Sequence, residues 1–330
     1  MRPRMKMKVQ KRRPFRTALK ILLAVVLILC ALLLLWRPAG KMIYRDFYRI
    51  AEEGVRIPGL DEGLVPQGVW LEGDRMLVSG HTGDELAYVY TVEKDGQSRR
   101  CSLTKGQAPI KGHICGIAAA EDIVIVTAED TVYAFSLQDV LAGPFAEALR
   151  AVSLDQHASF VTVDGDIYIG EFHYSPRYVC DHAYTDADGN ESHAVLCRYD
   201  REAFLAAMAD PEAPVPSPAA MYTLPDKVQG CALSGNTLVT VSSWGLSSSV
   251  YRVYTLPEVP EAEMNGVPLY VLDRNALVKT LEGPLMAEEM ALADGSLTVM
   301  HESAASKYMI GRLLGYTRVF RLDWNALITP

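Results

Sequence analysis

Histidine, glutamine and glutamate side chains recur at the starts and ends of short apolar segments along this chain. Imidazole, carboxamide and carboxyl groups bind ligands, coordinate metals and transfer protons, so their placement is a guide to chemistry. All seven histidines lie at such segment ends or in one insertion between segments. We select as ligand-binding candidates Gln67, His81, His113, His157, Glu171, Gln229, Trp244, Glu289, His301, Glu302 and Tyr308.

These candidates belong to a repeat made of two apolar strands joined by a tight, mostly acidic turn. The five copies are QGVWLEGDRMLVSGH from Gln67, CGIAAAEDIVIVTAED from Cys115, ASFVTVDGDIYIGEF from Ala158, QGCALSGNTLVTVSS from Gln229 and EEMALADGSLTVMHES from Glu288. A third strand follows each copy, and a fourth strand follows all but the last. Four antiparallel strands at this spacing are typical of a propeller blade.

The repeat predicts an all-β fold, a five-bladed β-propeller from about residue 54 to residue 324, with six blades as the alternative. Residues 55–60 precede the first copy as a fourth strand would, so we expect them to complete the last blade. A two-sheet sandwich would leave the repeat without a structural cause. We expect a short helix at 42–53 and insertions at 172–193, at 200–209, which has a helical pattern, and at 256–267.

Propeller geometry places the candidate residues on one face. The first strand of a blade starts at the same rim at which the second strand ends, and the candidates lie at these points. Polar residues there have a structural use as well, because they tie adjacent blades together by hydrogen bonds across the channel.

The amino terminus predicts a membrane anchor. Residues 21–36 read ILLAVVLILCALLLLW without a charge, and with residues 18–20 they are long enough to span a bilayer. Nine basic residues and no acidic one lie before this stretch or in its first turn, which predicts a cytoplasmic amino terminus. A cleaved signal peptide is the alternative. The predicted organisation is a basic cytoplasmic arm at 1–17, a transmembrane signal anchor at 18–36, a juxtamembrane linker at 37–53 and an extracytoplasmic propeller at 54–330.

The charge distribution excludes one class of partner. The formal net charge of the 330 residues is −8, but 12 of the 32 basic residues lie before position 46. The remaining 20 basic residues face all 40 acidic ones, a formal −20 for the rest of the chain. Such a surface repels nucleic acid, so we expect no nucleic-acid partner.

Cysteines and short motifs add little chemistry. Cys180 and Cys197 flank a predicted hairpin and are candidates for a disulfide, whereas Cys115 and Cys231 lie in apolar strands as buried thiols.

The stretch at 186–190 imitates the start of a calcium loop but lacks the closing glutamate, so we interpret it as a hairpin turn. The chain has no nucleophile elbow, zincin motif, P-loop or dinucleotide fingerprint.

Several motifs together resemble a known group of proteins. They are PQG from Pro66, HICGIA from His113, IGEF from Ile169, QGCA from Gln229, SSWGLSSS from Ser242 and ESAASKY from Glu302. The pattern resembles bacterial secreted or membrane-anchored β-propellers of poorly assigned function. More remotely, it is similar to the calcium-dependent lactonase propellers of the gluconolactonase and paraoxonase kind, in which a glutamate at the start of the first strand binds the metal.

This chain departs from the lactonase pattern in its first two blades. Gln67 takes the place of the metal-binding glutamate, and the second blade offers His113 and Cys115. Only the last blade supplies carboxylates at this position, Glu288 and Glu289, so the pattern for a calcium ion is incomplete.

Two functions follow from these observations. The first is a binding module whose rim holds a small molecule, a glycan or a protein, with Trp244 as an apolar platform. The alternative is a metal-dependent lactonase or esterase-like hydrolase on the same rim. A divalent metal, preferably zinc, would then be held by a subset of Glu171, Glu289, Glu302, His113, His157 and His301.

Overall fold

The structure is a computed structural model that describes residues 13–308, 311 and 315–329. The chain divides into two units, Met1–Ile43 and Tyr44–Pro330. In the first unit a single helix, α1 (Arg13–Ile43), includes the apolar stretch at 18–36, and the predicted arm at 1–12 lies outside the described residues. A search of the described residues for helices of sufficient length and apolarity to cross a membrane finds none.

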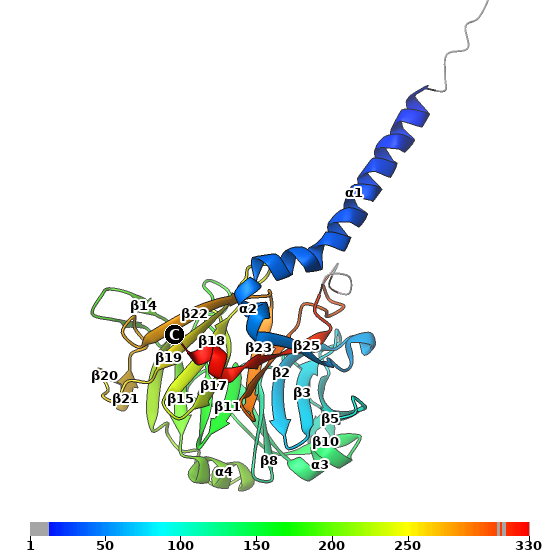
Figure 1. Ribbon diagram of the computed structural model, residues 1–330. Coiled ribbons are helices and arrows are strands. Elements are labelled where there is room, and N and C mark those ends of the chain that lie inside the picture. The colour runs from blue at the N-terminus through cyan, green and yellow to red at the C-terminus, as the bar shows by residue number, and fades with distance from the viewer. Residues whose placement is uncertain (1–12, 309–310, 312–314, 330) are drawn as a thin grey trace, which may run out of the picture. The chain divides into compact units, whose positions relative to one another are not determined.

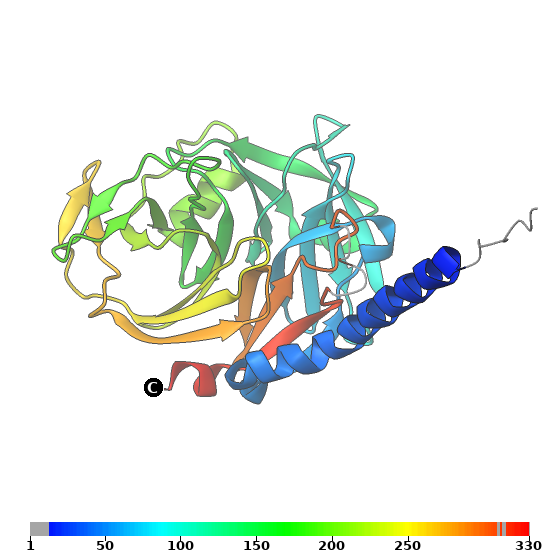
Figure 2. The ribbon, with the colours of Figure 1, turned by 90° about the horizontal axis from the view of Figure 1, so that it is seen from above.

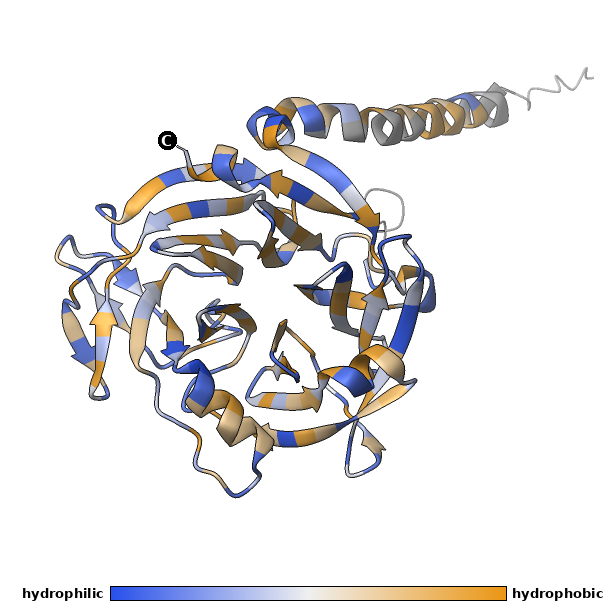
Figure 3. Cartoon of the chain, turned by 60° about the horizontal axis from the view of Figure 1, so that its bottom comes forward, coloured by the Kyte–Doolittle hydropathy of each residue, from blue (hydrophilic) through white to orange (hydrophobic). Residues whose placement is uncertain are grey.

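The second unit is a β-propeller, in which antiparallel sheets form a ring around a common axis (Figures 1 and 3). The described residues form five four-stranded blades, the number that the repeat predicts. Blade 1 contains β2 (Val65–Glu72), β3 (Arg75–His81), β4 (Ala87–Val92) and β5 (Ser98–Lys105). Blade 2 contains β7 (Ile117–Ala120), β8 (Ile123–Ala128), β9 (Thr131–Ser136) and β10 (Phe145–Val152).

The other three blades follow the same order from the axis outward. Blade 3 contains β11 (Phe160–Asp164), β12 (Asp166–Gly170), β15 (Ala194–Tyr199) and β16 (Ala220–Leu224). Blade 4 contains β17 (Val228–Ser234), β18 (Thr237–Ser242), β19 (Ser249–Thr255) and β22 (Leu277–Gly283). Blade 5 contains β23 (Ala287–Ala293), β24 (Ser296–His301), β25 (Arg318–Asp323) and β1 (Ala51–Arg56).

The ring closes through β1, which pairs antiparallel with β25 and supplies the missing fourth strand of the last blade. Figure 2 shows the last strands, in orange and red, beside the blue strands of blade 1. The closing strand is 51–56 rather than the predicted 55–60, because pairs such as Ala51 with Leu322 and Glu53 with Phe320 set its register. The expected helix at 42–53 correspondingly ends earlier, at Ile50.

The segment predicted as a juxtamembrane linker is partly propeller core. Phe47, in the short helix α2 (Arg45–Ile50), is fully buried. Its ring lies 5.7 Å from Tyr251 of blade 4 and 5.2 Å from Phe320 of blade 5. The prediction that the propeller begins at residue 54 is therefore wrong, because apolar burial extends the unit back to Tyr44.

Insertions and edge strands complete the unit. The helical pattern at 200–209 forms α4 (Arg201–Ala209), whose first turn is capped when the Asp200 carboxylate accepts the N–H of Ala203. A small hairpin of β13 (Tyr184–Thr185) and β14 (Glu191–Ser192) encloses the turn at 186–190, which confirms that interpretation. The remaining elements are β6 (Ala108–Pro109), α3 (Leu137–Ala142), β20 (Ala262–Met264), β21 (Val267–Tyr270) and α6 (Trp324–Ile328).

The predicted disulfide is absent. Cys180 and Cys197 are both free and buried, so their pairing is a wrong prediction. Cys197 points into the core of blade 3 from β15, whereas the Cys180 thiol donates to the carbonyl oxygen of Phe172 at 3.4 Å. Sequence spacing did not reveal that the two side chains have different partners.

Glycines let the innermost strands approach one another closely. Gly68, Gly116 and Gly230 hold equivalent positions: Gly68 and Gly230 lie in the first half of β2 and β17, and Gly116 comes just before β7. A Cβ atom on Gly68 would lie 2.8 Å from the backbone nitrogen of Ile117, and one on Gly230 would lie 2.7 Å from the Cα atom of Glu289. The glycine that recurs at this position of the repeat is thus required for the close packing of the blades.

We predict that Gly230→Ala destabilises the propeller by about 1–3 kcal/mol, because the new methyl group meets the backbone of blade 5. Urea unfolding of the variant and of the wild type measures the difference. Gly83→Ala is the control, since a Cβ atom there meets nothing within 4 Å. Equal losses in the two variants would contradict the packing argument.

Candidate functional site

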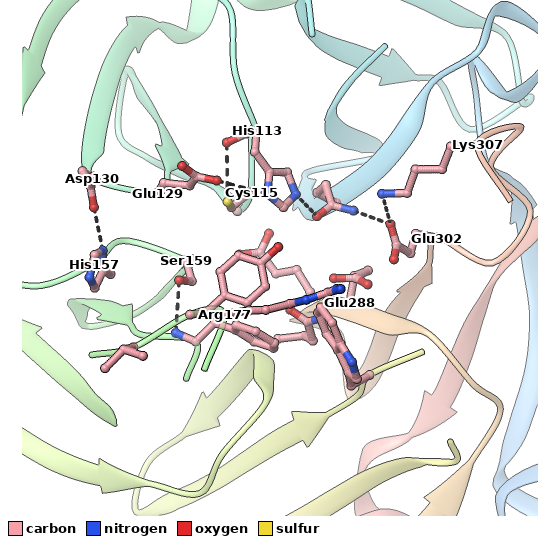
Figure 4. Close-up of a pocket in the computed structure, with 18 of the residues that line it drawn as sticks. His113, Cys115, Glu129, Asp130, His157, Ser159, Arg177, Glu288, Glu302 and Lys307 are labelled. Carbon is pink, nitrogen blue, oxygen red and sulfur yellow. Dashed lines mark hydrogen bonds and ion pairs between the residues drawn. The ribbon is translucent and has the colours of Figure 1, made fainter. Parts of the chain in front are cut away.

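A pocket of about 460 Å³ opens where the five innermost strands begin (Figure 4). Each blade contributes one side chain from an equivalent position, and we call this set the inner ring: Gln67, Cys115, Ser159, Gln229 and Glu288. The other lining residues are His113, Gly116, Glu129, Asp130, His157, Phe172, Arg177, Tyr178, Val179, Trp244, Glu289, Glu302, Lys307 and Tyr308.

β-Bulges help to present the inner ring. Gln67 is an extra residue between the pairs Pro66–Gly80 and Gly68–Ser79, and Gln229 is an extra residue at the same place in blade 4. In blade 5 the bulge sets Glu288 and Glu289 opposite a single residue of β24. A bulge changes the direction of side chains in a strand that otherwise alternates strictly, and bulges are common beside functional sites.

Glu289 ties four blades together. Its Oε2 atom accepts the N–H groups of Val69 at 3.0 Å and Ile117 at 2.9 Å, and its Oε1 atom accepts that of Val161 at 3.0 Å. Burial raises the pKa of Glu289 to about 8, and the three N–H donors act in the opposite direction. Both side-chain oxygens of Glu289 therefore accept hydrogen bonds from the backbone of other blades.

A hydrogen-bonded chain connects blades 2, 1 and 5 along one wall. Gln67 Nε2 donates to Glu302 at 2.9 Å, which leaves Gln67 Oε1 to accept from His113 Nε2 at 2.7 Å. Glu302 also pairs with Lys307 at 3.1 Å and accepts the hydroxyl of Tyr308. Burial lowers the pKa of His113, so its ring is a neutral donor at Nε2. Three donors around Glu302 hold it in one orientation.

Glu288 differs from its neighbour Glu302. Burial, and then the nearby Glu302 carboxylate, raise the pKa of Glu288 well above its usual range. The protonated form of Glu288 is therefore favoured more strongly than that of an exposed glutamate. In its protonated form Glu288 can donate a hydrogen bond, whereas the Glu302 oxygens accept those of Gln67, Tyr308 and Lys307.

The opposite wall is aromatic. The Trp244 ring lies 4.7 Å from Tyr174, 5.7 Å from Phe172 and 5.8 Å from Tyr178. Trp244 comes from the loop between β18 and β19 of blade 4, and the other three come from the insertion that follows β12 of blade 3. The contacts among these rings fix a partly exposed apolar surface beside the polar network.

The rim between these walls carries charge. The His157 Nδ1 atom lies 2.6 Å from the Asp130 carboxylate, and His113 Nδ1 lies 3.7 Å from Glu129. Figure 4 shows Asp130 and His157 at one side of the pocket, and Lys307 with Glu302 at the other. Arg177 extends across the space between them.

Eight of the eleven candidates line this pocket: Gln67, His113, His157, Gln229, Trp244, Glu289, Glu302 and Tyr308. His81, Glu171 and His301 are absent from its lining. The His81 ring lies 4.8 Å from that of His113, and burial lowers its pKa to about 4. Glu171 is buried, pairs with His182 at 2.9 Å and accepts the N–H of Val195 at 3.0 Å.

His301 lies in the core of blade 5. It is fully buried, its Nδ1–H donates to the carbonyl oxygen of Leu285 at 2.9 Å, and its ring packs against Phe320 at 5.3 Å. Its place at the end of a second strand predicted exposure on the rim. The side chain points instead into the blade, because residues alternate between the two faces of a strand.

One cluster outside the pocket has the composition of a metal site. Ligand atoms of His173, His193 and Asp226 lie within 4.8 Å of one another, and the two imidazoles stack at 4.7 Å. However, His173 Nδ1 accepts the N–H of Cys180 at 3.1 Å, so the ring proton is on Nε2. Neither nitrogen of His173 has a free lone pair for a metal in this arrangement.

Several pocket residues were not among the sequence candidates. Lys307 lies within the ESAASKY motif, and Ser159 follows from aligning the inner strands, so the repeat contained a signal for both. Arg177 and Tyr178 lie in an insertion outside the repeat, and nothing in the sequence pattern places them at the pocket.

We predict a pH dependence of stability from His301. Burial lowers its pKa from 6.5 to about 4, so the unfolded chain binds this proton at a higher pH than the folded one. The contribution is complete above pH 6.5 and is lost as the pH falls toward 4, up to about 3 kcal/mol. His301→Asn keeps a donor for Leu285 but cannot titrate, so its stability should fall less between pH 7 and pH 4. Urea unfolding at both pH values measures this, and equal losses would contradict the assignment.

Comparisons with known proteins give no family. No protein-family model matches the sequence, and a comparison with curated proteins finds no significant match. Among solved structures, the PQQ-bound form of an aldose sugar dehydrogenase from Streptomyces coelicolor is 14% identical, with a TM-score of 0.46 over 83% of this chain and 97% of that one. A putative oxidoreductase (glucose dehydrogenase) from Thermus thermophilus is 13% identical, with a TM-score of 0.44 over 82% and 99%. The likeness to these proteins concerns the fold.

Proposed function

We propose that this protein is a membrane-anchored, extracytoplasmic binding module whose pocket holds a saccharide. The observation that carries the proposal is the pairing of two unlike walls around one space of about 460 Å³. One wall is the hydrogen-bonded chain of His113, Gln67 and Glu302, and the other is the aromatic group around Trp244.

A saccharide has the chemistry that both walls require. Its hydroxyl groups donate and accept hydrogen bonds, which suits a wall that offers carboxylate, carboxamide and imidazole groups at fixed positions. Its ring carries an apolar C–H face, which suits an indole surface. Because the polar groups are already held by one another, little side-chain entropy is lost when a ligand binds.

The alternative, a metal-dependent hydrolase, has less support from the geometry. Its proposed ligands include Glu289, whose two oxygens accept three backbone N–H groups. They also include Glu171 and His301, which have partners elsewhere in the fold. Assembly of this metal site would require the blades to lose those contacts.

The anchored location rests on the sequence. It derives from the uncharged stretch at 21–36 and from the excess of basic residues before it. A binding module held outside a membrane is consistent with the acidic composition of the remaining chain, which favours solubility and neutral or cationic partners.

We predict that Trp244→Ala weakens saccharide binding by about 1–3 kcal/mol, through loss of the stacking surface. Isothermal titration calorimetry with a panel of neutral and acidic mono- and oligosaccharides identifies a ligand and measures the change. Phe145→Ala is the control, because Phe145 is an exposed aromatic residue of β10 that does not line the pocket. Failure of every saccharide to bind the wild type would overturn the proposed function. Equal affinities in the two variants would remove Trp244 from the site.

A further inference from the structure

Arg177 is a charged side chain of the pocket for which the described residues provide no hydrogen-bond or ion-pair partner. It lies in the insertion that follows β12, is exposed to solvent and extends across the pocket (Figure 4). Within the part of the chain that the structure describes, its guanidinium group makes neither a hydrogen bond nor an ion pair. A guanidinium group is always protonated and has five N–H donors in a fixed plane, so it is suited to an anionic acceptor that a ligand could supply.

The second cation of the pocket is already engaged. Lys307 pairs with Glu302 at 3.1 Å, and Glu302 also accepts from Gln67 and Tyr308. This group of charges is therefore balanced without a ligand. Among the described residues that line the pocket, Arg177 is the arginine or lysine side chain that remains available.

The acidic groups of the pocket do not compensate Arg177. Glu129 and Asp130 are largely exposed and lie near His113 and His157 on the blade 2 side. Glu289 accepts backbone N–H groups, and burial raises the pKa of Glu288, which favours its uncharged form. In that form Glu288 offers a negative group a hydrogen-bond donor rather than a like charge.

We propose that the ligand is an acidic saccharide whose carboxylate pairs with Arg177; this inference rests on the proposed function of the pocket. A carboxylate matches the guanidinium fork with two parallel hydrogen bonds. The exposed carboxylates Glu129 and Asp130 repel an anion on their side and can accept hydrogen bonds from hydroxyl groups. This distribution orients the sugar, with its carboxylate at Arg177, its hydroxyls toward blade 2 and its apolar face on Trp244.

Matched sugars test the inference on the full-length protein in detergent. D-Glucuronate and D-galacturonate differ from D-glucose and D-galactose only in the oxidation of one carbon. Calorimetric titration should show at least tenfold tighter binding of a uronate than of its neutral counterpart, and a preference that declines as salt is added. Oligomers of the same sugars extend the comparison to longer ligands.

Variants assign the preference to one side chain. Arg177→Gln should reduce uronate affinity at least tenfold and leave the affinity for the neutral sugar within about twofold, while Arg177→Lys should retain part of the preference. Arg274→Gln is the control, since it removes the same charge from an exposed arginine that pairs with Asp188 outside the pocket lining.

The outcomes separate the two proposals. Equal binding of acidic and neutral sugars, or a preference that survives Arg177→Gln, would overturn the acidic ligand and leave a saccharide pocket. Failure of all these sugars and their oligomers to bind would overturn the saccharide pocket itself, and the acidic ligand with it.

Discussion

A single glutamate side chain in the channel holds the propeller around its axis. Glu289, from the innermost strand of blade 5, accepts backbone N–H groups of blades 1, 2 and 3. These donors sit where inner strands converge and have no strand partner on that side. A buried N–H group without an acceptor costs about 1–3 kcal/mol, so one side chain removes three such costs and fixes the spacing of the blades.

The glycines and the bulges follow from this arrangement. Three other blades have a glycine at the position that Glu289 holds in blade 5. These glycines are Gly68, Gly116 and Gly230, and a side chain at any of them would meet a neighbouring backbone or Glu289 itself. The position immediately before belongs to the inner ring and lines the pocket. Closure of the channel and construction of the pocket thus use adjacent residues of the same strands.

The pocket combines parts of different origin. The inner ring comes from the repeat, so its geometry is as rigid as the blades. The aromatic wall and Arg177 come mainly from the insertion after β12, which places Phe172 and Tyr178 against Trp244 of blade 4. Propellers host many functions on one frame, and here the insertion supplies the features that distinguish the two walls.

The sequence by itself determined the blades. Alternation of apolar residues, acidic turns and the spacing of the copies predicted five four-stranded units, and the helical pattern at 200–209 predicted α4. These signals are local, because side-chain alternation and turn chemistry depend on neighbouring residues.

Only the tertiary structure decided the rest. Glu288 and Glu289 are identical in type and adjacent in sequence, yet Glu288 lines the pocket near Glu302 and Glu289 accepts backbone N–H groups of three other blades. The register of β1, the free state of Cys180 and the place of Arg177 also depended on partners far away in the chain. The role of a polar side chain is set by the groups that surround it after folding, and a strand pattern does not encode those groups.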